Sequence, residues 1–248
     1  MTSTRISMWA GPRNISTTMM RSFESRPDTA VIDEPFYAYY LNVSGASHPM
    51  RDDILAALPT DWRSVVSLLT GPAPGGEPIY FHKVIAYHAA DQEGPFDWLE
   101  ECRPFLLIRS PRAMVASYVK KYEDVAPIAQ SLIIQRRIHQ HMTARNLPCP
   151  VVDAADILKN PEAMLSALCG ALHIPFRKEM LSWRSGPRES DGVWAPHWYD
   201  AVLNSTGFKP YEDRPVSLSK ELDEIAAACT DDYEALFEAR LTLANASA

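Results

Sequence analysis

Residues 9–18 combine a basic side chain with a chain geometry suited to binding an anion. The segment reads Trp-Ala-Gly-Pro-Arg-Asn-Ile-Ser-Thr-Thr and joins an apolar run at 6–10 to a helical pattern at 17–25. A loop at this point can direct backbone N–H groups and the positive end of a helix at an anion, while Arg13 adds a fixed charge. The alternative is a plain strand-to-helix turn capped by Ser or Thr. The Gly-Lys pair of a nucleotide-triphosphate P-loop is absent.

A second segment of the same kind begins at Arg109. Residues 107–118 read Leu-Ile-Arg-Ser-Pro-Arg-Ala-Met-Val-Ala-Ser-Tyr and follow the apolar run 104–108. Ser110 is suited to cap a helix and Pro111 to occupy its first position. A guanidinium beside a helix N-terminus favours a phosphate, and the alternative is an ordinary capped helix next to a solvated arginine.

Two candidate catalytic side chains lie between these segments. Val31-Ile32-Asp33-Glu34-Pro35 places a carboxylate, Glu34, at the end of an apolar run, where it can act as a general base or cap a helix. Lys83 lies in the run Tyr80-Phe81-His82-Lys83-Val84-Ile85, where it either serves the site or is a solvated strand residue.

The elements that must position these side chains follow from the order of apolar runs and helical patterns. Strands are predicted at 6–10, 29–32, 79–85, 104–108 and 150–152, and helices at 17–25, 111–122 and 126–145. This alternation predicts an α/β fold with three layers, in which helices flank a central five-stranded parallel sheet. The carboxyl ends of parallel strands share one edge, so Arg13, Glu34, Lys83 and Arg109 are expected to lie together there.

The two basic segments together resemble sulfotransferases that use 3′-phosphoadenylyl sulfate (PAPS), a family with a P-loop, nucleotide-kinase-like fold. Residues 12–17 resemble the family's 5′-phosphosulfate loop, which usually reads Pro-Lys/Arg-Ser-Gly-Ser/Thr-Thr. Residues 109–117 resemble its 3′-phosphate motif, an Arg with a Pro two residues on and a Ser eight residues on. Ile15 replaces the usual Gly, at a loop position that often needs a positive φ.

The resemblance implies a donor, an acceptor and a set of site residues. PAPS would donate a sulfuryl group to a hydroxyl of a small-molecule acceptor, without a metal. Ile85 stands where hormone-type members have a catalytic His, so Glu34 is the predicted base, with Arg13 and Lys83 stabilising charge on the sulfuryl group. The implied cofactor-binding residues are Arg13, Asn14, Ile15, Ser16, Thr17, Thr18, Arg109, Ser117 and Arg188, the last as the nearest equivalent of the family's Arg-Lys-Gly segment.

Two other functions stay open at this point. A P-loop kinase or nucleotide hydrolase would use Asp33 and Glu34 to hold Mg²⁺. A nucleotide-binding regulatory protein would keep the cradle without turnover, and Ile15 supports that alternative. The acceptor is not specified, because Phe36, Tyr37, Tyr39, Tyr40 and Trp198 permit a lipid, a phenol or a sugar.

Composition narrows the class of protein. The 248 residues include 24 Lys and Arg against 31 Asp and Glu, a net charge of −7, which argues against a nucleic-acid or anionic-membrane surface. Four scattered cysteines, and His139 and His141 on different helix faces, predict neither disulfides nor a metal site. Without a long apolar stretch, we expect a cytoplasmic protein of one domain, residues 1–248. Its unpatterned segment 184–215 is a predicted lid or acceptor loop, and its oligomeric state is not indicated.

Overall fold

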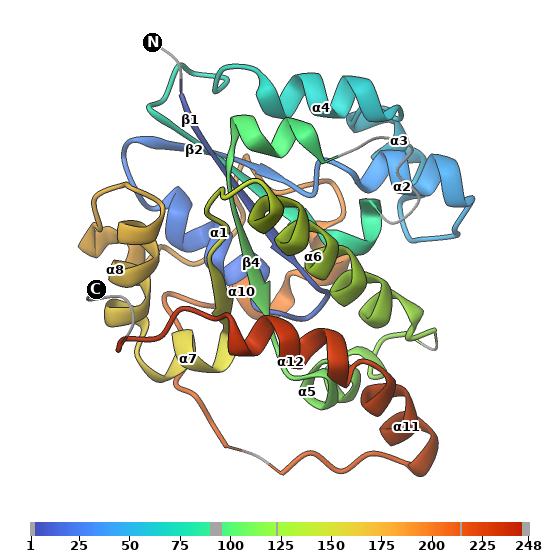
Figure 1. The fold of residues 1–248 in the computed structure, drawn as a ribbon. Helices are drawn as coiled ribbons and strands as arrows, with labels where there is room; N and C mark the ends of the chain where they lie inside the picture. Colours follow the sequence, from blue (N-terminus) through green and yellow to red (C-terminus); the bar gives the residue numbers. More distant parts are fainter. Residues whose placement is uncertain (1–2, 90–95, 123, 214, 245–248) are drawn as a thin grey trace.

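Five parallel strands form the centre of the molecule in the order β2-β3-β1-β4-β5 (Figure 1). The computed structural model describes residues 3–89, 96–122, 124–213 and 215–244. The strands are β1 (Thr4–Ala10), β2 (Thr29–Asp33), β3 (Ile79–Ile85), β4 (Arg103–Ile108) and β5 (Val151–Asp153). Each lies within two residues of its predicted bounds, so the predicted five-stranded α/β fold is confirmed.

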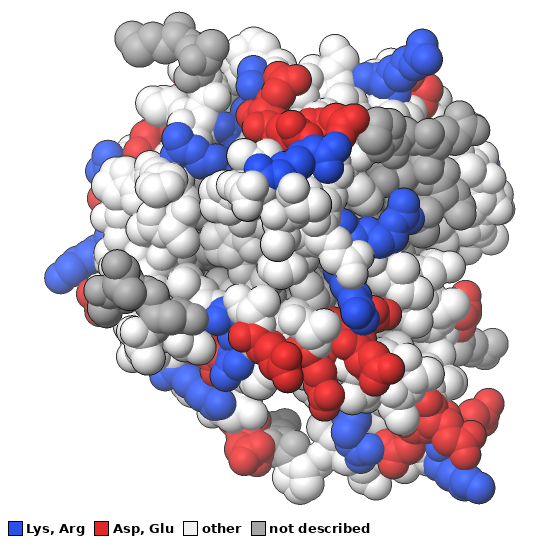
Figure 2. All heavy atoms as spheres, viewed as in Figure 1, with Lys and Arg blue, Asp and Glu red and all other residues white. Residues whose placement is uncertain are grey.

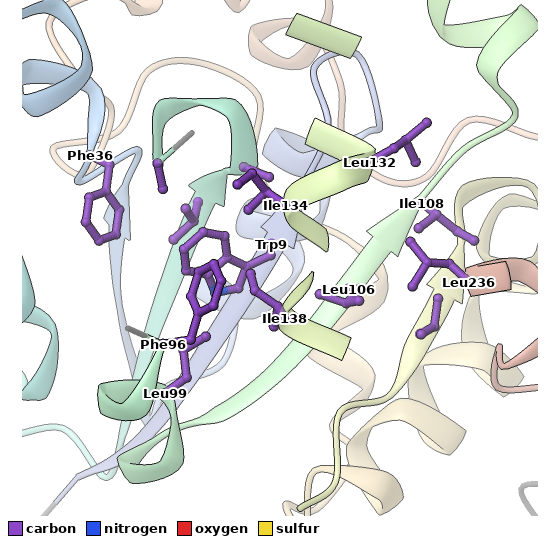
Figure 3. Packing of buried hydrophobic residues seen from close by; sticks show 14 of the residues in the cluster. Trp9, Phe36, Phe96, Leu99, Leu106, Ile108, Leu132, Ile134, Ile138 and Leu236 are labelled. Atoms are coloured by element: carbon purple, nitrogen blue, oxygen red, sulfur yellow. The ribbon is translucent and has the colours of Figure 1, made fainter. Parts of the chain in front are cut away.

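The strands bury both faces, because successive side chains point to opposite sides of the sheet. On β1, Met8 and Ala10 belong to one buried cluster and Trp9 to the other. Figure 3 shows Trp9 among Phe96, Ile134 and Ile138 in the second of these clusters. This two-sided burial explains why the strands read as continuous apolar runs rather than as alternating ones.

Helices cover both faces of the sheet. The longer ones are α1 (Ser16–Glu24), α2 (Tyr37–Ser44), α3 (Arg51–Ala57), α4 (Trp62–Thr70), α5 (Pro111–Tyr118), α6 (Ala126–Ala144), α8 (Pro161–Ala171), α11 (Lys220–Ala228) and α12 (Thr230–Glu238). The shorter ones are α7 (Ala154–Lys159), α9 (Ala195–Trp198) and α10 (Asp200–Leu203), with 3₁₀ turns η1 (Ala86–Ala89), η2 (Asp97–Glu101) and η3 (Lys178–Leu181). Side chains of α1, α7 and α8 fill one buried cluster, and those of α4, α5, α6 and α12 fill the other.

Some local predictions differ from the structure. The helix expected over 111–122 ends at Tyr118 and gives way to a turn, in which the rings of Tyr118 and Tyr122 stack at 4.3 Å. The unpatterned segment 184–215 contains α9 and α10, whose four residues each are too few to show a helical period. Its Trp194 and Tyr199 are buried with residues of α2 and α3.

On the face that carries α6 and α12, charged side chains of both signs reach the surface. Basic side chains lie singly or in small groups, and acidic ones gather over α11 and α12 (Figure 2). In the described part of the chain, no helix is long and apolar enough to cross a bilayer.

Candidate active site

A cavity of about 340 Å³ lies at the carboxyl edge of the sheet. The loop 12–18 after β1 lines it, together with Glu34 after β2, Arg109 after β4 and Ser117 of α5. Of the residues described, Glu34 is the single carboxylate in this lining, and Arg13, Arg109 and Lys209 are its cations. Parallel topology therefore brings side chains from three strand ends to one cavity, as the sequence predicted.

The loop after β1 is held in a strained conformation. Arg13 and Ile15 have φ angles of 63° and 55°, the left-handed region that a β-branched side chain rarely adopts. Ile15 thus takes the positive φ for which the related loops use Gly. The buried Asn14 side chain donates a hydrogen bond to the carbonyl of Leu107 at 3.0 Å, which fixes the loop against β4. Strain of this kind persists where the surroundings determine the conformation, often at a functional site.

Hydrogen bonds join the two basic segments directly. Arg109 donates to the backbone carbonyl of Arg13 at 2.6 Å, and Nε of Arg13 donates to Oγ of Ser117 at 3.2 Å. Burial and then the nearby charge of Arg13 lower the pKa of Arg109. Two arginines joined in this way line the same cavity, an arrangement that favours an anion.

A buried ion cluster lies on the other side of the cavity. Lys83 on β3 pairs in register with Asp33 on β2, and its ammonium donates to Asp33 at 2.8 Å and to Glu34 at 2.6 Å. The third donation goes to the hydroxyl of Tyr199 at 2.7 Å. An ammonium has three donors, so the hydrogen-bonding capacity of Lys83 is filled.

Segment 191–199 completes this cluster from a distant part of the chain. The Tyr199 hydroxyl donates to Asp33 at 2.5 Å and accepts from Nε1 of Trp194 at 3.2 Å. The backbone N–H of Gly192 also donates to Asp33, at 3.2 Å. Nearby, Asp191 forms a 2.6 Å ion pair with the buried Arg21 of α1, which fixes the segment to the body of the fold.

The side chain of Glu34 is largely buried, at 12% exposed, and it lines the cavity. Its φ is 41°, and its backbone N–H donates to the carbonyl of Lys83 at 2.8 Å. Burial, and after it the charge of Asp33, raise its pKa, while Lys83 opposes that rise. Its second oxygen lies 3.8 Å from Nδ1 of His88, a buried ring stacked on Tyr37 at 4.5 Å. Glu34 therefore does not cap α2.

Aromatic residues line the cavity beside Glu34. They are Tyr37, Tyr87, Tyr118, Tyr122, Trp198 and Tyr199. Burial raises the pKa of each tyrosine among them, so their hydroxyls are neutral donors and acceptors at ordinary pH. The cavity lining thus combines cationic, aromatic and carboxylate side chains.

The predicted site residues fall into three groups in the structure. Those that line the cavity are Arg13, Asn14, Ile15, Ser16, Thr17, Thr18, Glu34, Arg109 and Ser117. Lys83 lies behind Glu34, with its side chain 1% exposed. Arg188 is not brought to the cavity: its guanidinium donates to the carbonyl of Arg184 at 2.8 Å and lies 3.7 Å from Glu24. The Arg188 side chain lies instead beside Glu24, the last residue of α1.

Sequence reasoning missed Tyr199 and His88. Tyr199 is 116 residues from Lys83, in a segment without a period, and the aromatic cluster 194–199 was the sole signal for it. His88 was expected to be an ordinary histidine, and neither of its ring nitrogens has a hydrogen-bond partner in the structure. A buried imidazole without a partner is a signal that only the packed structure reveals.

A different group of titratable residues gathers between η2 and α6. Asp97, Glu100 and His141 place ligand-type atoms within 4.8 Å of one another, a proximity that the sequence did not predict. Arg145 pairs with both carboxylates, at 2.9 Å from Asp97 and 2.5 Å from Glu100. One guanidinium thus pairs with both carboxylates and compensates one of their two negative charges.

Comparison with known proteins identifies the family. The sulfotransferase domain profile matches residues 4–240, nearly the whole chain. The chain belongs to the sulfotransferase domain family. This membership places it among proteins that transfer sulfuryl groups, and it confirms the resemblance seen in the two basic segments.

Two curated Arabidopsis thaliana relatives are similar to this sulfotransferase-family chain over most of its length. Branched-chain-amino-acid aminotransferase-like protein 2 is 32% identical over 93% of the chain, and protein 1 is 34% identical over 85%. The matched regions make up 41% and 37% of those proteins. The chain therefore spans about two-fifths of the length of the curated relatives it matches.

Solved structures share the fold at low sequence identity. A sulfotransferase domain from the curacin biosynthetic pathway has a TM-score of 0.51 at 16% identity, covering 92% of this chain and 98% of that one. The sulfotransferase domain of the Synechococcus PCC 7002 olefin synthase has a TM-score of 0.54 at 14% identity, with 93% and 96% covered. A sulfotransferase from Alicyclobacillus acidocaldarius has a TM-score of 0.56 at 12% identity, with 97% and 98% covered.

Proposed function

We propose that this protein transfers a sulfuryl group from PAPS to a hydroxyl of a small-molecule acceptor. The observation that carries the proposal is the pairing, in one cavity, of a guanidinium cluster with a buried carboxylate. Arg13, Arg109 and Glu34 all line this cavity. A donor with two anionic groups suits the guanidinium groups, and an alcohol that must lose a proton suits the carboxylate.

The cofactor would be held by the two joined segments. Ser16, Thr17 and Thr18 at the start of α1 line the cavity, and the free backbone N–H groups of a first helical turn suit the phosphosulfate. Arg109 and Ser117 suit the 3′-phosphate, and this anion would take over the hydrogen bond that Ser117 now accepts from Arg13. Selection of PAPS over adenylyl sulfate follows from that second anion site.

Glu34 would act as the general base. Its raised pKa is favourable, because a carboxylate made more basic by burial accepts an alcohol proton more readily. As the acceptor oxygen forms its bond to sulfur, the S–O bond to the phosphate breaks and the proton passes to Glu34. Arg13 and the loop N–H groups would stabilise charge on the leaving phosphate.

Lys83 takes a different place from the one that the family resemblance implied. Its three donors are engaged by Asp33, Glu34 and Tyr199, so we propose that it acts on Glu34 rather than on the sulfuryl oxygens. Trp198 and Tyr199, from segment 184–215, would form the acceptor wall that keeps water from the sulfuryl group.

No observation favours the kinase or hydrolase alternative over this proposal. Asp33 and Glu34 both bind the ammonium of Lys83, so the cation between these carboxylates is already supplied by the chain. The position of Ile15, the main support for an inactive binding protein, is compatible with the loop because Ile15 adopts the positive φ itself.

A ligand comparison by thermal shift tests the proposal. A ligand at 100 times its Kd stabilises the fold by about 2.7 kcal/mol. We expect stabilisation by the desulfated product PAP that exceeds the stabilisation by AMP, and none by ATP with Mg²⁺. The reverse order, with ATP and Mg²⁺ stabilising and PAP without effect, would contradict the proposal.

Matched arginine variants test the second anion site. Arg109→Ala should lose most of the PAP-induced shift and little of any AMP-induced one, because only PAP carries the 3′-phosphate. Arg112→Ala is the control: it lies three residues along, and its guanidinium pairs with Asp223 and the carbonyl of Val216. Equal losses with both nucleotides in Arg109→Ala would mean that this guanidinium does not bind the 3′-phosphate.

A further inference from the structure

Two carboxylates share a single ammonium in the buried cluster. Asp33 and Glu34 both accept hydrogen bonds from Lys83, and the side chains of Asp33 and Lys83 are each 1% exposed. The two negative charges and one positive charge leave the cluster with a net charge of −1. A simple ion pair between Lys83 and Glu34 would have none.

We propose that Asp33 is a positioning residue that keeps Glu34 basic by sharing the charge of Lys83 with it. This inference rests on the proposed role of Glu34 as the base. Without Asp33, the ammonium would belong to Glu34 alone, and a carboxylate in a close one-to-one ion pair holds its proton weakly. With Asp33 present, Lys83 still orients Glu34 but neutralises it only in part.

The geometry gives Asp33 two tasks, to share the ammonium of Lys83 and to hold segment 191–199 through Tyr199 and Gly192. It lies in register with Lys83 on the neighbouring strand, behind Glu34, and it is absent from the cavity lining. Its oxygens accept from Lys83, from the Tyr199 hydroxyl and from the N–H of Gly192. These three donors fix the carboxylate at hydrogen-bond distance from the ammonium.

The other groups around Glu34 add no charge to this balance. His88 of η1 faces its second oxygen, and burial lowers the pKa of His88 far below its usual value, so the ring is neutral. Tyr37 of α2, Tyr87 of η1, Tyr122 after α5 and Tyr199 after α9 have raised pKa values and are neutral too. Asp33 and Lys83 are thus the charged partners that set the basicity of Glu34, and the charge of Asp33 acts to raise its pKa.

The acidic limb of the pH profile of kcat/KM for sulfuryl transfer tests the inference, because it reports the ionisation of the essential base in the free enzyme. In Asp33→Asn, the amide oxygen can still accept from Lys83, but an NH2 group replaces the oxygen that accepts from Tyr199 and Gly192, so the charge and these two bonds are lost together. We expect the limb to move toward acid by about one pH unit, the size typical of changing one neighbouring charge at this range. The plateau rate should fall as well, since the base is weaker.

Asp153→Asn is the matched control. Asp153 is a buried carboxylate at the end of β5 that also accepts from a tyrosine hydroxyl and a backbone N–H, but no lysine links it to Glu34. Its limb should stay where the wild-type limb lies. A limb that moves equally in both variants, or in neither, would overturn the inference.

Asp33→Ser keeps the inference testable if Asp33→Asn does not fold. Its small hydroxyl avoids placing an amide NH2 group against the N–H of Gly192. The charge is lost as in Asp33→Asn, so the limb should again move toward acid, and a limb at the wild-type position would overturn the inference. Failure of the proposed function is seen separately, as an absence of PAP-induced stabilisation or as transfer that survives in Glu34→Gln.

Discussion

The two edge strands of the sheet end in nearly the same local structure. β2 ends at Asp33 and β5 at Asp153, and both carboxylates are buried. Tyr199 donates to Asp33, and Tyr233 donates to Asp153 at 3.1 Å. Each carboxylate also accepts from a backbone N–H, that of Gly192 or of Ala155.

The two ends differ in the charge beside the carboxylate. Burial raises the pKa of Asp153, which caps α7 by accepting from the N–H of Ala155 and also accepts from Tyr233 of α12. At the end of β2, Lys83 on the adjacent strand and Glu34 on the next residue turn the same motif into an ion cluster. A strand-end aspartate is therefore a capping residue or part of a reactive site according to the strand that lies next to it, which is β4 in one case and β3 in the other.

The largest expected effect is on the rate of sulfuryl transfer, which should fall for a change at the end of β2 and not for one at the end of β5. Glu34→Gln should lower sulfuryl transfer by about 10²–10⁴-fold, the usual contribution of a general base, with PAP binding retained. Asp153→Asn should retain transfer, measured in the same assay with radiolabelled or chromatographically resolved product. Comparable losses in both variants would mean that the β2 end has no special part in the reaction.

Removing the cation at the end of β2 should lower the unfolding free energy more than removing one near the end of β5. Lys83→Met leaves two buried carboxylates without their partner, and breaking a buried pair in this way costs about 3–5 kcal/mol of unfolding free energy. Lys159→Met, on α7 near the β5 end, removes an exposed lysine 3.9 Å from Asp156 and should cost less than about 1 kcal/mol. Urea unfolding curves measure both, and similar midpoints for the two variants would contradict the comparison.

Smaller losses of stability are expected when the hydroxyl of Tyr199 or of Tyr233 is removed, since each donates to one of the two strand-end aspartates. Tyr199→Phe removes a hydroxyl that bonds to two charged groups, for which we expect a loss of about 1.5–3 kcal/mol. Tyr233→Phe removes one bond to a carboxylate, the lower limit of that range. Chemical denaturation of the two variants under identical conditions should rank Tyr199→Phe as the less stable, and the opposite ranking would contradict this estimate of the cluster.

His82 sharpens the comparison, because it is buried without a charged partner. Burial, with a smaller effect from Arg5, lowers its pKa from 6.5 to about 3. The unfolded state therefore binds a proton that the folded state does not, and stability present above pH 6.5 is lost as pH falls toward 3. The slope is about 1.4 kcal/mol per pH unit. When the pH falls from 7 to 5, the unfolding free energy of His82→Leu should decrease by about 2 kcal/mol less than that of the wild type, as measured in urea titrations.

Much of this architecture followed from the sequence because strands buried on both faces are long apolar runs. Parallel topology then brought Arg13, Glu34 and Arg109 to one cavity, a consequence of strand order rather than of side-chain detail. The hydrogen-bond partners of Lys83 were harder to predict from the sequence. Tyr199 reaches it from a segment of short turns, where neither period nor spacing indicates direction.

The sequence pattern also did not indicate that the helix predicted over 111–122 ends at Tyr118. Residues 111–122 carry good helix formers, and the stacked rings of Tyr118, Tyr122 and Trp198 involve a residue from the distant α9. Tertiary contacts of this kind override local propensity. The guanidinium of Arg188 was likewise placed by a neighbour, Glu24, that no motif indicates.

The central position of β1 has a consequence for synthesis of the chain. β1 pairs with β3 from Ile79 onward and with β4 from Arg103 onward, so the first strand to be made has no sheet partner until some 70 to 100 residues later. At about 5–20 residues per second, a ribosome needs roughly 5–20 s to supply them. During that interval Met8, Trp9 and Ala10 have no strand to pair with, and their apolar side chains lack the sheet neighbours that bury them in the folded protein. The loop that follows β1 can meet Arg109 and Ser117 only after that wait has ended.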